Sequence, residues 1–153
     1  MGSDPLELAY RFLGDRDRTT AELRRHLRRR GVDEESVGEV VQELTEQGSL
    51  DDQRYARAFA DDRRTLDGWG SERIAQRLRA AGIPDEVCER ALAPLQSEEL
   101  EAAVELLGRR LRHPPADDAA RQRALGLLVR KGYELELAYD AIRRFERERG
   151  QAA

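Results

Sequence analysis

Residues 50–83 read LDDQRYARAFADDRRTLDGWGSERIAQRLRAAGI, and this stretch predicts two helices joined by a tight break. Asp51 stands where an N-cap carboxylate accepts hydrogen bonds from the first free N–H groups of a helix. The sequence Gly68-Trp69-Gly70 interrupts that helix, and Ser71 is predicted to cap the next one. Gly82 is predicted to end the second helix, because glycine tolerates the left-handed conformation that closes many helix C-termini.

The same pattern recurs along the whole chain. Gly31, Gly82 and Gly132 are separated by 51 and 50 residues (82 − 31 and 132 − 82), and a leucine stands four residues before each of them. A repeat of this length indicates one supersecondary unit used several times. We predict an all-α fold of three tandem three-helix repeats in an elongated, curved array. The predicted repeats span residues 1–49, 50–99 and 100–153.

The composition agrees with such an array. Charged residues make up 38% of the chain, and the apolar fraction of 39% is low for one compact globule. An array of small units, each burying little surface, accounts for both values. No apolar run is long enough to span a bilayer, and Met1–Leu13 lacks a signal-peptide pattern, so a soluble, cytoplasmic protein is predicted.

Nothing in the sequence predicts catalysis, a metal site or a cofactor. Cys88 aligns with aliphatic residues of the other two repeats, which favours a small core residue over a nucleophile. His26 and His113 lie in different repeats, and no metal-ligand spacing links them. Residues 68–70 lack the preceding strand and the further glycine of a dinucleotide site. We therefore expect a non-enzymatic protein without a metal or a cofactor.

The best candidate for nucleic-acid contact is the second helix of the first repeat, where arginines could follow phosphate groups. The alternative is a solvated face paired with nearby glutamates. The second and third helices of each unit look like a helix-turn-helix, but the third helix of the first repeat carries only acidic charges and would repel phosphate. Phosphate contacts are therefore predicted for second helices, at Arg24, Arg25, Arg28 and Arg29.

Trp69, between two glycines, has two open interpretations. It is either a plug between repeats or an exposed anchor, since Trp and Arg dominate interface hot spots, and both hold if only one ring face is buried. The helix after Asp51 is predicted to bury a face that includes Phe59 and Leu66. The arginines predicted to point outward and to contact a partner are Arg54, Arg57, Arg63, Arg64, Arg73 and Arg77.

The chain resembles the RecX family, small bacterial regulators of the RecA recombinase. An ordered string of residues carries the match: Leu50-Asp51-Asp52, Arg54-Tyr55-Ala56, Phe59, Gly68-Trp69-Gly70, Ile74, Leu78 and Gly82-Ile83. The first repeat also agrees with the family, and the third agrees weakly. The resemblance therefore covers nearly the whole chain and is strongest over its first two-thirds.

The resemblance implies a non-enzymatic protein that binds the RecA filament on single-stranded DNA. Bound there, it would block filament growth, damp ATP hydrolysis, strand exchange and co-protease activity, and so regulate DNA repair, recombination and the SOS response. We expect a monomer. Direct DNA binding is expected to be weak at most, because the net charge is −4. Whether it caps filament ends or lines the groove stays open.

Two other classes of function also stay open. A stand-alone nucleic-acid-binding module would bind bare DNA with a steep salt dependence. A helical adaptor would bind some other protein.

Overall fold

The fold is described by a computed structural model that covers residues 4–151. Within this range the chain forms nine α-helices, one π-helical turn and no strand, so the predicted all-α class is confirmed. In chain order the elements are α1 (Pro5–Gly14), α2 (Thr20–Arg29), α3 (Glu34–Glu46), α4 (Asp52–Asp62), η1 (Arg63–Asp67), α5 (Ser71–Ala80), α6 (Asp85–Gln96), α7 (Glu99–Arg110), α8 (Asp118–Lys131) and α9 (Leu135–Gln151).

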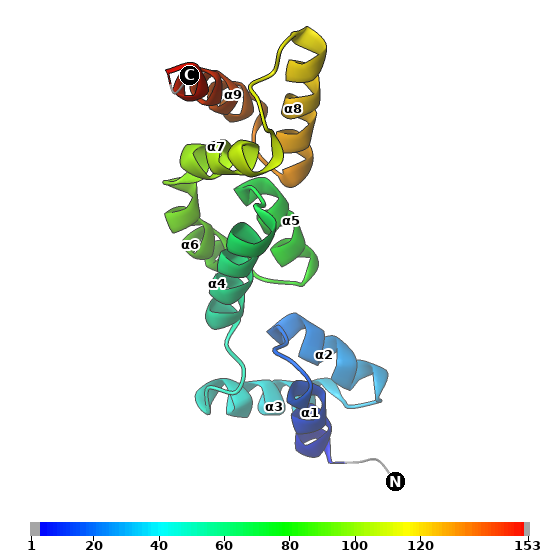
Figure 1. The fold of residues 1–153 in the computed structure, drawn as a ribbon. Helices are drawn as coiled ribbons and strands as arrows, with labels where there is room; N and C mark the ends of the chain where they lie inside the picture. Colours follow the sequence, from blue (N-terminus) through cyan, green and yellow to red (C-terminus); the bar gives the residue numbers. More distant parts are fainter. Residues whose placement is uncertain (1–3, 152–153) are drawn as a thin grey trace.

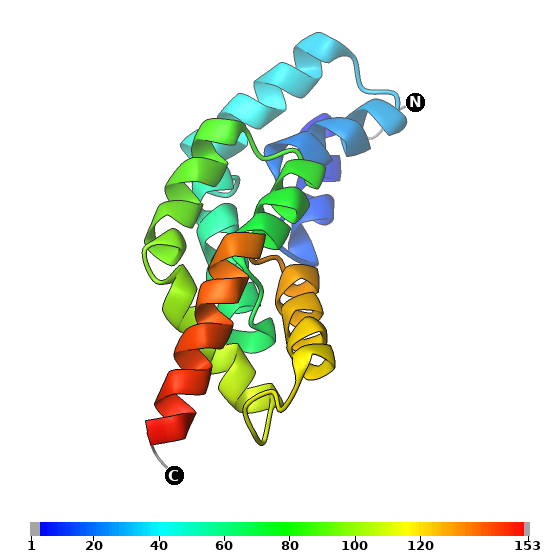
Figure 2. The same ribbon diagram turned by 90° about the horizontal axis from the view of Figure 1, so that it is seen from above.

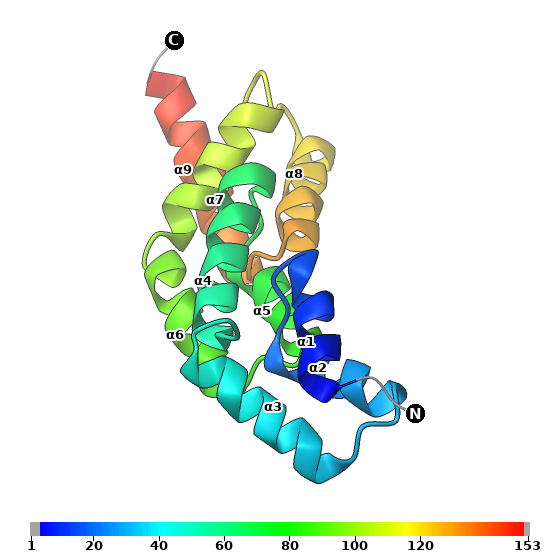
Figure 3. The same ribbon diagram turned by 90° about the horizontal axis from the view of Figure 1, so that it is seen from below.

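The helices form three units in a row, as the repeat predicted. We call α1–α3 the first unit, α4–α6 with η1 the second, and α7–α9 the third. Each unit has its own apolar core, and the helices pack mainly within their own unit. Figure 1 shows the units as an elongated, curved array with the chain termini at opposite ends. Seen along that row, from above and from below, the three units lie over one another (Figures 2 and 3).

In the first unit, α2 is held at both ends by local interactions. Thr19 Oγ1 accepts from the N–H of Glu22 at 3.1 Å, and Glu22 Oε1 accepts from the N–H of Thr19 at 2.8 Å, which is a capping box. Leu23 and Leu27 are fully buried in the unit's core. Gly31, with φ of 82°, follows the helix in the left-handed conformation that its place in the repeat predicted.

In the second unit, a π-helical turn changes which side chains reach the core. The Asp51 cap is confirmed, since its carboxylate accepts from the N–H of Arg54 at 3.0 Å. After α4, the chain widens into η1, and the wider turn breaks the regular period on which the predicted apolar face was based. Leu66 is consequently 68% exposed, so the prediction that it is buried was wrong.

The third unit is built on the same plan. Asp117 caps α8 by accepting from the N–H of Ala120 at 2.8 Å, and Gly132, with φ of 103°, closes that helix. Tyr133, directly after Gly132, is buried in the unit's core. The predicted boundary between the second and third repeats, after residue 99, falls at the first residue of α7.

The two junctions between units use one bonding pattern twice. At the first junction, the hydroxyl of Thr19, the N-cap residue of α2, donates to the carbonyl of Ala81 at 2.6 Å. The first N–H of α2, on Thr20, donates to the carboxylate of Asp52 at 2.8 Å. Ala81 precedes the stop glycine of the second unit, and Asp52 is the first residue of its first helix. The N-terminus of α2 in the first unit is thus hydrogen-bonded to the second unit.

The second junction repeats these contacts at the equivalent positions. The N–H of Gly70, the N-cap residue of α5, donates to the carbonyl of Lys131 at 2.8 Å. The first N–H of α5, on Ser71, donates to the carboxylate of Glu99 at 2.9 Å. The N–H groups of Thr20, Gly70 and Ser71 are ones that a helix start otherwise leaves unpaired, so the second helices of the first and second units depend on the following unit for them.

Glycine permits the close approach that both junctions need. A Cβ atom at Gly82 would lie 2.2 Å from the Cβ of Ala21, and one at Gly70 would lie 2.3 Å from the carbonyl oxygen of Gly132. Both distances are far below van der Waals contact. Gly70 and Gly82 therefore allow the units to meet, and Gly82 also closes a helix.

Candidate functional site

Trp69 lies in the loop between η1 and α5, at the junction of the second and third units. The side chain is 8% exposed, and its ring meets Phe59 edge-on, with centroids 6.2 Å apart. The ring is part of the apolar core of the second unit, so the indole is buried as the plug interpretation requires, but it lies within one unit rather than between two. The indole is also surrounded by cations, since the guanidinium carbon of Arg73 lies 4.1 Å from the ring centroid and that of Arg77 lies 5.3 Å from it.

A third arginine near the same ring, Arg63, is already paired within the chain. Its guanidinium lies 5.9 Å from the Trp69 centroid and forms an ion pair with Asp67 of η1. Cations within about 6 Å of an indole face are attracted by the ring quadrupole. Trp69 thus acts as a platform that orders neighbouring guanidinium groups.

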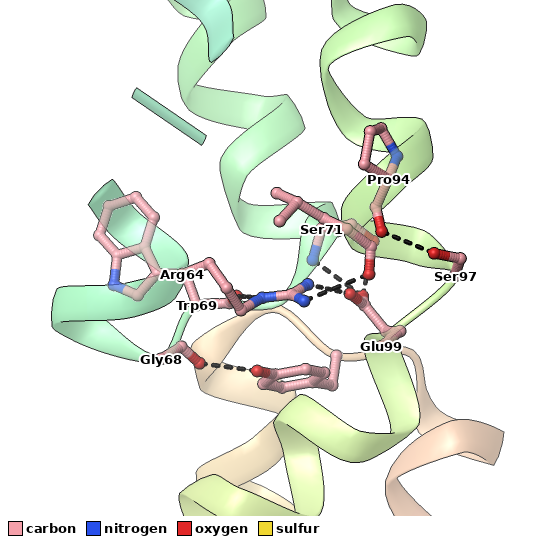
Figure 4. Close-up of polar contacts among 9 residues, drawn as sticks. Arg64, Gly68, Trp69, Ser71, Pro94, Ser97 and Glu99 are labelled. Carbon is pink, nitrogen blue, oxygen red and sulfur yellow. Dashed lines mark hydrogen bonds and ion pairs between the residues drawn. The ribbon is translucent and has the colours of Figure 1, made fainter. Parts of the chain in front are cut away.

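Arg64 was predicted to point outward, but the structure places its guanidinium inside the junction. The side chain is 11% exposed, and it donates to the carbonyls of Trp69 at 2.9 Å and Leu95 at 3.2 Å. Its remaining nitrogen forms an ion pair with Glu99 of the third unit. Figure 4 shows Arg64 reaching across beneath α5 to this carboxylate.

Glu99 connects three segments of the junction. Besides the ion pair with Arg64, its carboxylate accepts from the backbone N–H of Ser71 at 2.9 Å and from the Ser71 hydroxyl at 2.6 Å (Figure 4). The prediction that Ser71 caps α5 was therefore wrong, because Gly70 is the N-cap residue and Glu99 supplies the accepting oxygen. Sequence patterns could not identify this cap, since its acceptor lies 28 residues away.

The third unit adds cations that no sequence pattern indicated. Lys131 Nζ donates to the carbonyl of Asp67 at 3.2 Å, and a Cβ atom on Gly68 would lie 3.2 Å from a guanidinium nitrogen of Arg109. Burial, followed by the charges of Arg110 and Arg73, lowers the pKa of Lys131 below its ordinary value. The field of these guanidinium groups at Lys131 disfavours its charged form.

We call five residues the junction cluster: Arg73, Arg77, Arg109, Arg110 and Lys131. In the described part of the chain, none of the five forms an ion pair with a carboxylate, although twelve such pairs occur elsewhere. In the sequence, the one feature that could have pointed to Lys131 is its position directly before Gly132, the stop glycine of the third repeat. Arg109 and Arg110 carry no such signal, because they join the cluster only through the junction.

Two predicted contact residues, Arg54 and Arg57, lie elsewhere on α4. Arg54 is exposed and donates to the carbonyl of Gly48 at 2.9 Å, near the start of that helix. Arg57 is exposed one turn further along. Neither guanidinium lies over the Trp69 ring, so the predicted set divides into a group at the second junction and a separate pair on α4.

The arginines predicted to meet nucleic acid all lie on α2 of the first unit. Arg25 and Arg29 are exposed and Arg24 is half-buried. Arg28 donates two hydrogen bonds to the carboxylate of Glu34, at 2.6 and 3.1 Å. This is the pairing with a nearby glutamate that the solvated-face alternative predicted for all four arginines. That alternative applies to Arg28 and not to the other three, which form no ion pair in the described part of the chain.

The two candidate groups lie on the same side of the molecule. In Figures 1 and 3 the second helices α2, α5 and α8 run along one side of the array. Helix α2 carries four arginines against one glutamate, and α8 carries three arginines and a lysine against one aspartate. Helix α3 carries five glutamates and no cation. The molecule therefore has one basic side, although its net charge is −4.

The remaining candidates for chemistry have structural roles. Cys88 is buried in the second unit's core, as predicted, and its thiol donates to the carbonyl of Ile83 at 3.7 Å. The His26 ring stacks on Phe12, with centroids 4.1 Å apart, and burial followed by the charge of Arg30 lowers the pKa of His26.

The described residues contain neither a cluster of metal ligands nor a membrane span. Among residues 4–151, no group of three or more His, Cys, Asp and Glu side chains could hold a metal ion. No helix over the same residues is long and apolar enough to cross a membrane.

Comparison with known families matches all three units. Family profiles described as the first, second and third three-helix domains of RecX match residues 6–44, 51–92 and 97–142, respectively.

Full-length relatives and solved structures agree with these profiles. The chain is 36% identical to a "Regulatory protein RecX" of Mycolicibacterium smegmatis, over 88% of this chain and 76% of the relative. It is 35% identical to the protein of that name in Trichlorobacter lovleyi, over 88% of this chain and 91% of the relative. The crystal structure of RecX from Lactobacillus salivarius superposes with a TM-score of 0.81 at 20% identity, over 93% of this chain and 94% of that one.

Proposed function

The chain belongs to the RecX family, and we propose on that basis that it regulates RecA by binding the RecA filament on single-stranded DNA. The observation that supports the proposal best is the cationic surface at the second junction, where two units present unpaired charges together. We also propose that the protein acts as a cytoplasmic monomer without enzymatic activity of its own.

The proposed mode of action is bridging. A helical polymer offers equivalent surfaces at a regular interval, and a rigid array of units can contact more than one subunit at a time. Holding neighbouring subunits in one geometry would resist the rearrangements that ATP turnover requires. Filament growth, ATP hydrolysis, strand exchange and co-protease activity would then fall together.

Within this proposal, the predicted contact residues have different roles. Arg54, Arg57, Arg73 and Arg77 are proposed to contact the partner directly. Trp69 is proposed to act through the guanidinium groups stacked on it, because little of its own surface is exposed. Arg63 is half-buried and paired with Asp67, so we propose a weaker contribution from it.

We propose that α2 supplies a second contact, with DNA phosphate or with an acidic surface of the filament. Charge reversal of Arg24, Arg25 and Arg28 together is expected to weaken filament binding, more strongly at low salt. Charge reversal of Arg90 on the acidic helix α6 is a matched control, and it should leave affinity almost unchanged. Equal affinities for wild type and triple variant at two salt concentrations would refute a contact through α2.

The experiment that tests the function is a titration of the protein into preformed RecA filaments on single-stranded DNA, followed by ATP hydrolysis. We expect hydrolysis to fall at substoichiometric amounts of protein, because one bridged contact affects more than one subunit. An unchanged rate would contradict the proposal.

The second candidate function is a stand-alone nucleic-acid-binding module, which the basic side of α2, α5 and α8 favours. Its measurement is binding to bare single- and double-stranded DNA at increasing salt. A steep fall in affinity with salt, together with unchanged ATP hydrolysis by RecA, would favour this candidate. No effect in either assay would leave an adaptor for another protein.

A further inference from the structure

The junction cluster contains the chain's single lysine. All other basic side chains apart from the two histidines are arginines, 26 of the 27 Lys and Arg residues. Lys131, the last residue of α8, is half-buried, and its ammonium donates to the carbonyl of Asp67 at the end of η1. The carboxylate of Asp67 is paired with Arg63, so it is already used by another cation.

The cluster is held together although its members repel one another. Burial lowers the pKa of Lys131 most, the charges of Arg110, Arg73 and Arg109 lower it further, and the charge of Asp67 raises it. An arrangement of this kind costs stability unless an anion neutralises it. The fold keeps the cations in place through the contacts of the junction itself, including the 3.3 Å bond from Arg73 to the carbonyl of Arg130.

Trp69 also prepares the cluster for binding. Guanidinium groups that stack on an indole lose rotamer freedom before a ligand arrives, so less entropy is lost on binding. Arg73, which lies 4.1 Å from the ring centroid, keeps donors beyond the one bonded to Arg130. A planar guanidinium fork fits a carboxylate or a phosphate through two parallel hydrogen bonds.

Two observations favour carboxylates over nucleic-acid phosphates as the ligand. The sequence pI is about 5.4, whereas nucleic-acid-binding domains are usually basic overall. The aromatic rings at the junction, Trp69 and Tyr133, are buried, so they offer no platform on which a base could stack. A small cationic site on an acidic protein suits an acidic protein surface better than a long polyanion.

We infer that the junction cluster is a binding site for a carboxylate-rich segment, made of Asp and Glu side chains, on a protein partner. The inference rests on the proposed function, because it identifies the chemistry of the filament surface that this junction contacts. It extends the site to Arg109, Arg110 and Lys131 of the third unit, which no sequence pattern selected.

The single lysine allows a direct test by cross-linking. A zero-length carbodiimide condenses a lysine amine with a carboxylate in contact with it, and a phosphodiester does not form that amide. We expect RecA filaments to yield an amide between Lys131 and an Asp or Glu of RecA, identified by mass spectrometry. Lys131→Arg keeps the charge and should abolish the product, whereas Arg123→Gln on the same helix should not.

A second measurement needs no filament and follows Lys131 acetylation in the free protein. The probes are a decaglutamate peptide and, separately, a thymidine oligonucleotide of the same charge. A carboxylate close to Lys131 should raise its pKa by about 1 unit, which slows acetylation roughly tenfold at a pH below that pKa. Arg109→Gln with Arg110→Gln should reduce the protection that the peptide gives, while Arg123→Gln should preserve it.

The outcomes separate this inference from the proposed function. Loss of RecA ATPase activity on titration, without any cross-link through Lys131, would overturn the carboxylate site and leave the regulator proposal standing. Protection by the oligonucleotide and not by the peptide would also overturn it, in favour of a phosphate site. Unchanged RecA ATPase with saturable protection by decaglutamate would support the site and refute the regulator proposal. Absence of protection by decaglutamate in the free protein would overturn the site whatever the filament assay gives.

Discussion

Replacing Glu99 by alanine tests whether the buried ion pair holds the second and third units together. Its side chain is 8% exposed and accepts from Arg64 and twice from Ser71. The substitution leaves a buried guanidinium without its anion and removes the acceptor for the first N–H of α5. Removing one partner of a buried pair costs about 3–5 kcal/mol of unfolding free energy, because the other charge remains desolvated.

For a chain of this length, that loss should lower the midpoint of thermal unfolding by roughly 6–20 °C. The measurement is unfolding in urea and on heating, followed by far-UV circular dichroism. Ser71→Ala removes only the hydroxyl bond and should cost about 1–2 kcal/mol. Glu101→Ala, two residues along the same helix and exposed, should change stability by no more than about 0.5 kcal/mol.

The double substitution Arg64→Met with Glu99→Leu separates charge from packing. If the cost of Glu99→Ala comes from an unpaired buried charge, replacing both partners by apolar side chains should restore much of the lost stability. A loss below about 1 kcal/mol for Glu99→Ala would refute the conclusion that this pair holds the junction.

Two further predictions concern the same junction. Gly70→Ala should destabilise the fold by at least about 1–3 kcal/mol, since the new Cβ would lie 2.3 Å from the carbonyl of Gly132, whereas Gly14→Ala meets no atom within 4 Å and should be nearly neutral in the same denaturation assay. Burial raises the pKa of Tyr133 to about 12, so an ultraviolet titration should show this tyrosine ionising after the others. Because the folded pKa is above the unfolded value of about 10, the stability that Tyr133 contributes should be intact below pH 10 and lost as the pH rises toward 12. Ionisation of every tyrosine near pH 10 in the folded protein would contradict its burial.

Local chemistry made most of the fold predictable. The spacing of Gly31, Gly82 and Gly132 identified the repeat, because a helix stop needs a residue that accepts positive φ and the structure has one at each place. Asp51 was predictable as a cap because the N–H group that it accepts from belongs to a residue only three positions away. The apolar period failed at Leu66, where the chain enters a π turn that no pattern in the sequence marks.

The candidate site was predictable only in part. Trp69 and the arginines beside it were selected, and the indole is buried, although within the core of the second unit and not between two units. The inward direction of Arg64 was missed, because its anion is 35 residues away in the next unit. Lys131 was missed for the same kind of reason, since its contact with Asp67 spans 64 residues.

The amino-acid sequence by itself determined the helices, their stops and the number of units, because capping, helical period and glycine conformations act over a few residues. Only the tertiary structure decided which charges are used inside the molecule and which are left for a partner. The arginines on each side of Trp69 are chemically alike, yet Arg64 is neutralised by Glu99, while Arg73 pairs with no carboxylate of residues 4–151. The physical reason is that a charge is paired or free according to what the next unit brings within a few ångströms of it, and the chain places those groups together only by folding.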